Sequence, residues 1–306
     1  MSSLLARFVP ELLRRARERG DAQSSHWQLD GSFVFADISG FTKLSEQLAE
    51  LGQAGAEELT VLLDATFESL LEVARADGGD LVKFGGDALL LFFAGEEHAA
   101  RACRAAYGMR SALKARGPVV TDRGRVLLRI SMGVHSGPFL FVVAGREQRD
   151  LFVLGEHATT VTAMESAADA GEILVSPSTA RLVPSSWLGR PKAGGVLLRG
   201  IDALPVASEP RAQLFDAADD WLEPFVPAQI RRRLVDDEHG AEHRRATIAF
   251  VHVGGIDDTL RDFGATVLAE RLDRVVRLAA DAAQQHEVAL LATDVAGGGV
   301  KLILTA

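Results

Sequence analysis

Two aspartates in short, glycine-containing segments are the residues of this sequence best suited to chemistry. Asp37 follows the apolar run 32–36, and Asp87 follows Gly85-Gly86 between two further apolar runs. Neighbouring strands of one sheet would bring the two carboxylates together, and divalent cations would relieve their mutual repulsion. Cations held in this way keep coordination positions open for phosphate oxygens, which suits phosphoryl or nucleotidyl transfer.

Each aspartate also has a plainer interpretation when it is taken alone. Asp37 stands where a residue could cap the following helix, and Asp87 stands in a turn, where aspartate is common. The glycines before Asp87 would let the backbone approach a ligand closely, but a tight hairpin also selects glycine. The two interpretations differ in whether the carboxylates meet.

The elements that must position these residues alternate between strand and helix, which predicts a protein of mixed α and β structure. Glycine breaks and changes of apolar periodicity mark their limits. The expected elements are a helix at 4–19, a strand at 32–37, helical periodicity at 41–76, a hairpin at 80–93, a helix at 96–116, a strand at 126–134, a hairpin through 136–138, a strand at 151–154 and a helix at 157–168.

The chain also repeats itself. Phe8-Val9-Pro10 is echoed by Phe225-Val226-Pro227, an offset of 225 − 8 = 217, and the segment 34–40 is echoed by 249–255, an offset of 249 − 34 = 215. The glycine hairpin around Gly86 is echoed by glycines 297–299, so a domain-sized duplication is expected. The predicted organisation is an N-terminal amphipathic helix and lead-in at 1–27, a first domain at 28–185, a linker at 186–244 and a partial, truncated second domain at 245–306.

Composition excludes several classes of partner. A net charge of −9 and a pI near 5.4 argue against non-specific electrostatic binding to nucleic acid or to anionic membrane. Cys103 is the only cysteine, which excludes disulfide frameworks and cysteine-cluster metal sites. No apolar run reaches the length of a membrane helix. We expect a cytoplasmic protein that binds neither nucleic acid nor membrane and needs metal for an anionic substrate.

The segments 35–42 (Phe-Ala-Asp-Ile-Ser-Gly-Phe-Thr) and 83–89 (Lys-Phe-Gly-Gly-Asp-Ala-Leu), whose aspartates are spaced by 87 − 37 = 50, together resemble the class III nucleotidyl cyclases. They look most like the tandem soluble adenylyl cyclase branch. The resemblance implies an α+β fold with a ferredoxin-like βααββαβ core, and an active site between two cyclase domains, either in cis or in a homodimer. It further implies conversion of ATP to 3′,5′-cyclic AMP and pyrophosphate with Mg²⁺ or Mn²⁺, two per site.

Residue by residue, the resemblance assigns Asp37 and Asp87 as catalytic metal ligands, with the Ile38 carbonyl as a further ligand. Phosphate contacts fall to Ser39, Gly40, Phe41, Thr42 and Gly86. Lys83 takes a base-contacting or anion-contacting position, with pairing to a carboxylate as the plainer alternative.

Some positions depart from the family pattern. Phe152, Thr159 and Ala163 stand where the family reads the base and stabilises the transition state, and none could do that work. His252 and Gly299 replace the metal aspartates of the second copy, so that copy is not expected to hold metal.

Two functions are therefore carried forward. The first is an adenylyl cyclase catalytic region that is incomplete, and so weakly active or inactive, as the chain stands. The second is a non-catalytic nucleotide- or anion-sensing module in a larger signalling protein, followed by an ATPase and helical-repeat region. A diguanylate cyclase or polymerase palm is disfavoured, because Ala88 stands where the former needs glutamate.

Overall fold

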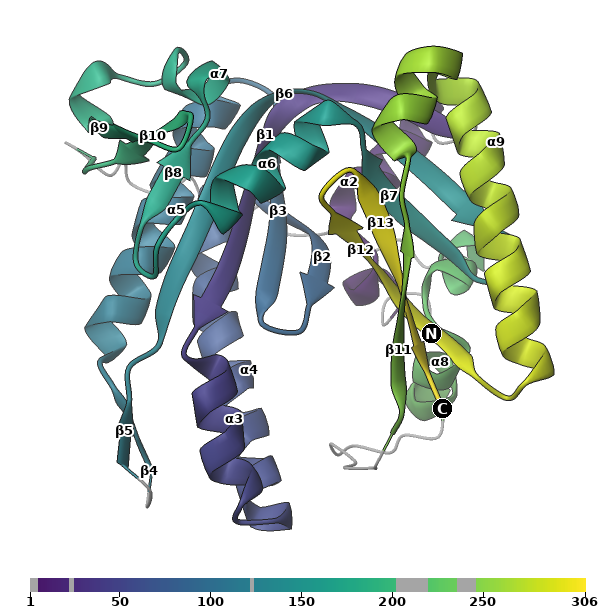
Figure 1. Cartoon of the computed structure of the whole chain (residues 1–306), viewed down its shortest axis with the longest axis horizontal. Helices are drawn as coiled ribbons and strands as arrows, with labels where there is room; N and C mark the ends of the chain where they lie inside the picture. Colours follow the sequence, from purple (N-terminus) through teal and green to yellow (C-terminus); the bar gives the residue numbers. More distant parts are fainter. Residues whose placement is uncertain (1–4, 22–24, 122–123, 202–219, 236–245) are drawn as a thin grey trace.

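The computed structural model describes residues 5–21, 25–121, 124–201, 220–235 and 246–306. The chain forms two regions that lie side by side in Figure 1. The first region, residues 25–201, is built on a large sheet, and the second region, residues 246–306, is built on a small one. No helix in the described part of the chain is long and apolar enough to cross a membrane.

The sheet of the first region has the strand order β2-β3-β1-β6-β8-β10-β9, with β7 paired to β6. Strand β1 lies at its centre and is antiparallel to both neighbours, β3 and β6, whereas β6 and β8 are parallel. The strands span β1 His26–Ser39, β2 Asp80–Gly85, β3 Ala88–Ala94, β6 Arg129–Gly145, β7 Arg149–Leu154, β8 Ile173–Val175, β9 Leu188–Lys192 and β10 Gly195–Leu198.

Alternation along β1 divides its side chains between two apolar layers. Val34, Ala36 and Ile38 pack under the helices α3 Phe41–Ala49, α4 Gln53–Ala76 and α5 His98–Arg116. This layer contains Cys103, which is fully buried, and burial raises the pKa of its thiol to about 12. Phe33 faces the opposite layer, where it packs against Phe92, Phe139 and Phe141.

The second layer is closed by α6 Glu156–Ser166, by α2 Glu11–Glu18 and by the 3₁₀ helix η4 Asp220–Phe225. Asp80 on β2 fixes α2, because its carboxylate accepts hydrogen bonds from the N–H groups of Glu11 (3.1 Å) and Leu12 (2.6 Å). The remaining short elements of the chain are η1 Ala6–Phe8, β4 Val119–Thr121, β5 Gly124–Val126, α7 Pro177–Ala180, η3 Ser185–Trp187 and α8 Ala228–Val235.

The second region consists of β11 Ile248–Val253, α9 Ile256–Gln285, β12 Ala289–Ala296 and β13 Gly299–Thr305. Its strand order is β11-β13-β12, all antiparallel, which matches the order β1-β3-β2 in the first region. Helix α9 packs against β6, and a shared core joins the regions, with Leu140 and Phe152 from the first and Leu272 and Leu302 from the second.

The element order β1-α3-α4-β2-β3-α5-β6 matches the expected βααββαβ core. Two details of the prediction were wrong. The expected hairpin at 136–138 is absent, because β6 runs unbroken through Ser136, Gly137 and Pro138, which all pair with β1. Proline is tolerated there because Pro138 falls between the stretch of β6 that pairs with β8 and the stretch that pairs with β7.

The other wrong detail concerns helix continuity. The helical periodicity predicted over 41–76 is divided into α3 and α4 at Gly52, whose φ of 65° no regular helix allows. The predicted helix at 4–19 is likewise interrupted at Pro10, after which α2 begins.

The sheet of the first region continues into the stretch predicted as the linker. Strands β9 and β10 lie within the stretch predicted as linker, yet they pair with each other and β10 pairs with β8. The sheet of the first region thus extends beyond residue 185. Residues 202–219 and 236–245 of the predicted linker lie outside the described residues.

Candidate active site at the end of the central strand

The end of β1 and the β2–β3 turn meet in the sheet, and this meeting brings Asp37 and Asp87 together. Asp37 pairs in register with Ala88, and the Ile38 N–H donates to the Asp87 carbonyl oxygen at 3.1 Å. The turn between β2 and β3 is therefore held against the last residues of β1. Gly86 supplies the left-handed conformation of the turn, with φ of 68°.

The surroundings of Asp37 disfavour the charged form of its carboxyl group. Asp37 lies on the same face of β1 as Phe33, away from helices α3–α5. Burial raises the pKa of the Asp37 carboxyl, and the charge of Asp87 raises it further. No lysine or arginine is among the groups that shift this pKa. A cation between the carboxylates would remove both costs.

A third acid, Glu165 on α6, acts on the same site. Its Oε1 accepts a hydrogen bond from the Ser131 hydroxyl at 3.0 Å, and Ser131 lies opposite Asp37 in the β1–β6 register. Burial is the main cause that raises the pKa of Glu165, and Asp37 and Asp87 add to it. Within the described residues, no three His, Cys, Asp or Glu side chains are placed to hold a metal ion together.

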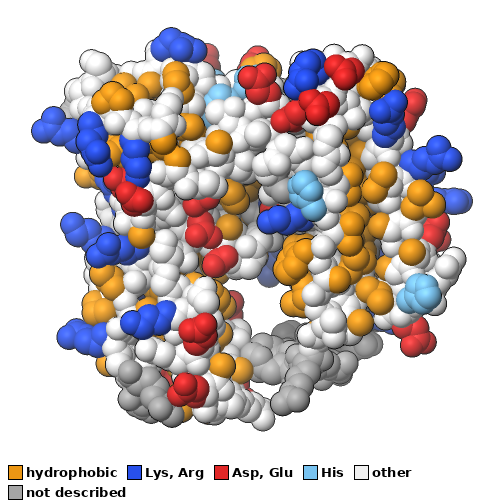
Figure 2. Space-filling view, in the orientation of Figure 1, with side chains coloured by type: hydrophobic (Ala, Val, Ile, Leu, Met, Phe, Trp, Pro, Cys, Tyr) orange, Lys and Arg blue, Asp and Glu red, His pale blue; other side chains and the backbone are white. Residues whose placement is uncertain are grey.

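Hard oxygen donors of this kind fit Mg²⁺ or Mn²⁺, which bind through one or two carboxylates and keep positions open for water and phosphate. The structure therefore fits the expected metal in its donor chemistry. Figure 2 shows acidic side chains on the first region where its surface borders the hollow between the two regions.

The segment predicted to contact phosphate forms the junction between β1 and α3. Gly40 precedes the helix with φ of 95°, and a Cβ there would come within 3.0 Å of the Leu127 carbonyl oxygen, so only glycine fits well. The N-cap residue of this helix, Gly40, has no side chain that could accept a hydrogen bond from the first N–H groups, which begin at Phe41 and Thr42. Such N–H groups are a favourable place for an anion.

Lys83 is committed to a contact between the two regions. Its Nζ lies 2.5 Å from Asp150 Oδ1 and 2.7 Å from the Thr293 hydroxyl, which in turn donates to Asp150. The ammonium also lies over the ring of Phe152, 5.6 Å from its centroid. These contacts match the plainer alternative for Lys83, pairing with a carboxylate.

Two positions that depart from the family pattern, Phe152 on β7 and Thr159 on α6, also form contacts between the two regions. Phe152 is buried in the shared core. The Thr159 hydroxyl donates to Asp257 Oδ2 at 2.8 Å and accepts from the Gly298 N–H at 3.2 Å. Sequence reasoning identified these positions but could not find their partners, which come from the second region.

Comparison with known proteins gives the family. The model of the adenylate and guanylate cyclase catalytic domain matches residues 29–202, more than half of the chain, so the chain belongs to this family. Adenylate cyclase type 10 of Oryctolagus cuniculus is 29% identical over 52% of this chain, and adenylate cyclase 1 of Rhizobium meliloti is 29% identical over 47%. The matched stretch spans only 10% of the former and 22% of the latter.

Solved structures of cyclases are similar as well. A bacterial light-regulated adenylyl cyclase has a TM-score of 0.50 at 19% identity, covering 64% of this chain and 58% of its own, and it shares the fold. The adenylyl cyclase CyaB from P. aeruginosa has a TM-score of 0.48 at 26% identity, covering 59% of this chain and all of its own. The class III cyclase family and its mixed α+β fold, predicted from the two aspartate motifs, are confirmed.

Proposed function

We propose that the chain is the catalytic region of an adenylyl cyclase, which converts ATP to 3′,5′-cyclic AMP and pyrophosphate. The observation that carries the proposal is the approach of Asp37 and Asp87 at the end of β1, where burial and the charge of Asp87 both raise the pKa of Asp37. ATP is proposed as the substrate because the relatives from Oryctolagus cuniculus and Rhizobium meliloti described above are named adenylate cyclases.

Asp37 and Asp87, with the Ile38 carbonyl, would hold two Mg²⁺ or Mn²⁺ ions. When bound, such ions lower the pKa of a ribose hydroxyl and neutralise charge on the phosphates. The residues of the chain position the triphosphate and the two carboxylates. Residues 39–42 and Gly86 present backbone to the triphosphate, and the β1–β3 register keeps the carboxylates from separating. Glu165 adds negative charge that strengthens the demand for cations.

The second region is proposed as a partial second cyclase domain. Its strand order, the same as β1-β3-β2, and the sequence echoes at offsets 215 and 217 support this interpretation. The full site in this proposal lies between two cyclase domains, from the same chain or from a second copy. A cytoplasmic location, the linker and an ATPase and helical-repeat continuation belong to the same proposal.

A second candidate is a sensing module that binds nucleotide or another anion without cyclising it. The contacts of Thr159 with Asp257 and Gly298, and of Lys83 with Asp150, favour it. They occupy positions that would otherwise face a nucleotide base or transition state. A role for Lys83 in contacting a base or anion would require its pair with Asp150 to open.

The decisive experiment measures metal–nucleotide binding and cyclic nucleotide formation on the same protein. The chain is titrated with a non-cyclisable ATP analogue plus Mn²⁺ by calorimetry, and is assayed for cyclic AMP and cyclic GMP from ATP and GTP. Asp37→Asn and Asp87→Asn should lose both signals, and Asp64→Asn, an exposed site on α4, is the matched control.

The outcomes separate the candidates. Cyclic AMP that disappears in both aspartate variants supports the cyclase. Metal-dependent binding without product supports the sensing module. Equal binding and equal product in wild type and Asp37→Asn would remove the metal site and both proposals with it.

A further inference from the structure

A second site candidate lies at the opposite edge of the first sheet. A cavity of about 600 Å³ opens between α5 and the strands β8, β9 and β10. The strand order places it beyond β6, whereas the turn that carries Asp87 lies on the β2–β3 side of β1. Its volume is within the range of small-molecule sites.

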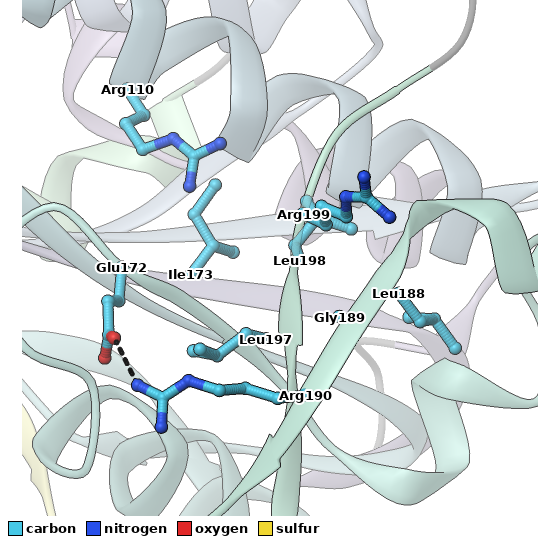
Figure 3. Close-up of a pocket in the computed structure, with 9 residues that line it drawn as sticks. All are labelled: Arg110, Glu172, Ile173, Leu188, Gly189, Arg190, Leu197, Leu198 and Arg199. Atoms are coloured by element: carbon cyan, nitrogen blue, oxygen red, sulfur yellow. Dashed lines mark ion pairs between the residues drawn. The ribbon is translucent and has the colours of Figure 1, made fainter.

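The wall of this cavity has an excess of positive charge. It contains three guanidinium groups, from Arg110, Arg190 and Arg199, and one carboxylate, from Glu172. Figure 3 shows the Arg110 side chain extending toward Ile173 and Arg190 reaching across to Glu172. The Arg190–Glu172 separation is 3.7 Å, and the Arg190 side chain is largely exposed.

Glu172 is shared between Arg190 and a further cation, Lys192. Its carboxylate forms an ion pair with Lys192 and accepts a hydrogen bond from the Asp169 N–H at 3.0 Å. These bonds lower the pKa of Glu172 and keep it ionised, with Lys192 as its main partner. The positive groups of the cavity are therefore only partly compensated, in a chain whose net charge is −9.

Among the three arginines of the cavity, Arg110 is the one best placed to bind a ligand. Its guanidinium lies over the Tyr107 ring, 4.8 Å from the centroid, which fixes its orientation. Burial lowers the pKa of Arg110, Tyr107 opposes that shift, and no carboxylate is among the groups that act on it. A half-buried guanidinium without an acidic partner has donors to offer a ligand.

We propose that this cavity binds a small organic anion, in which a phosphate or carboxylate group is joined to an apolar body. The anionic group would lie between Arg110 and Arg190, whose planar forks suit two acceptor oxygens. The apolar body would lie on Ile173, Leu197 and Leu198, which form the hydrophobic part of the wall. Apolar lining with few convergent polar groups is the usual composition of such sites.

The test uses four probes that separate the parts of this chemistry: phenyl phosphate, benzoate, inorganic phosphate and benzyl alcohol. Each is titrated into the whole chain by calorimetry and by ligand-observed NMR at low salt. Saturable binding of phenyl phosphate or benzoate, tighter than that of inorganic phosphate and with no binding of benzyl alcohol, is expected. Which of the two binds identifies the anionic group. Failure of both to saturate at millimolar concentration overturns the proposal.

Variants locate the binding. Arg110→Ala should weaken the better probe about tenfold or more, because a charge-assisted hydrogen bond is lost, and Arg190→Ala should weaken it less. Arg261→Ala, which removes an exposed arginine on α9, is the matched control and should bind like wild type. If Arg110→Ala fails to fold, Arg110→Gln, which keeps most of the side-chain stem, replaces it and should show the same loss of affinity. Wild-type affinity in both Arg110 variants would place the binding elsewhere and refute the site.

Discussion

The two regions have the same order of three strands but very different surroundings. Strand β1 is bordered by β6 along its whole length and by β3 from Gly31 to Asp37, and Phe33 on it is fully buried. In the described residues β11 pairs only with β13, and Phe250 on it is 66% exposed. Figure 2 shows hydrophobic side chains gathered over this part of the molecule. The shared strand order thus sets the path of the backbone in both regions. Burial on both sides of β1 makes this strand rigid enough to hold Asp37 close to Asp87.

The strongest way to break this comparison is to remove one aromatic ring from each strand. Phe33→Ala should destabilise the first region by about 3–5 kcal/mol, because it leaves a cavity among three other rings. Phe250→Ala should change stability by less than about 0.5 kcal/mol, as expected of an exposed site. Denaturant unfolding followed by tryptophan fluorescence measures both. Equal losses would show that β11 is as well packed as β1.

The next comparison exchanges the chemistry of the two strands. Asp37→His places in β1 the residue type that the sequence echo places in β11, and should lower cyclase activity roughly 10²–10³-fold, the loss typical when one main electrostatic group is removed. Initial rates with Mn²⁺ and ATP provide the measurement. Its control is His252→Asp, which should leave the rate unchanged. A rate close to wild type in Asp37→His would mean that Asp37 holds no metal.

The pH dependence of stability should differ between the regions because of Asp80. Burial raises the pKa of this carboxyl from 3.8 to about 6, against the lowering effect of the Glu11 and Leu12 N–H groups. The folded state therefore binds the proton more tightly than the unfolded state. This contribution to stability is complete below pH 4 and is lost as the pH rises through 6, by about 3 kcal/mol.

Asp80→Asn should flatten that slope while still accepting one hydrogen bond from α2. Unfolding free energies at pH 4, 5, 6 and 7 check it, with hydrogen exchange to separate the regions. A slope unchanged by the substitution would assign the pH dependence to other groups.

The smallest expected effect concerns the link between the regions. Lys83 has a side chain only 10% exposed and joins Asp150 and Thr293. Lys83→Met should cost about 1–2 kcal/mol, between the values for surface and buried pairs, since Asp150 retains some solvent contact. A double-mutant cycle with Thr293→Val should show coupling. Strict additivity would mean that the contact does not stabilise the association of the regions.

Local patterns were enough to predict most of the strands and helices of the first region and the segments that carry Asp37 and Asp87, whereas the full βααββαβ order came from the resemblance to the cyclases. Each of those segments combines a short apolar run with a glycine turn, which is information within a few residues. Glu165 was not predicted, because its approach to the site depends on the β1–β6 register at Ser131 and on the docking of α6. The hairpin at Pro138 was predicted wrongly, because a Gly-Pro signal cannot show that a partner strand changes at that point.

The partners of Lys83 and Thr159 were beyond sequence reasoning for a related reason. They lie in residues far away along the chain, Thr293, Asp257 and Gly298, and nothing in the local sequence of either residue marks them. Contacts between regions depend on how two finished surfaces fit, which periodicity does not encode.

The pairing of β1 with β6 over fourteen successive positions limits how this strand can evolve. Deleting one residue between Trp27 and Ala36 would turn Asp37 toward the helices α3–α5 and turn an apolar side chain toward Asp87. Insertions and deletions should therefore be tolerated at the ends of β1 but eliminated within it, so the spacing from Trp27 to Asp37 should stay constant wherever the activity is retained.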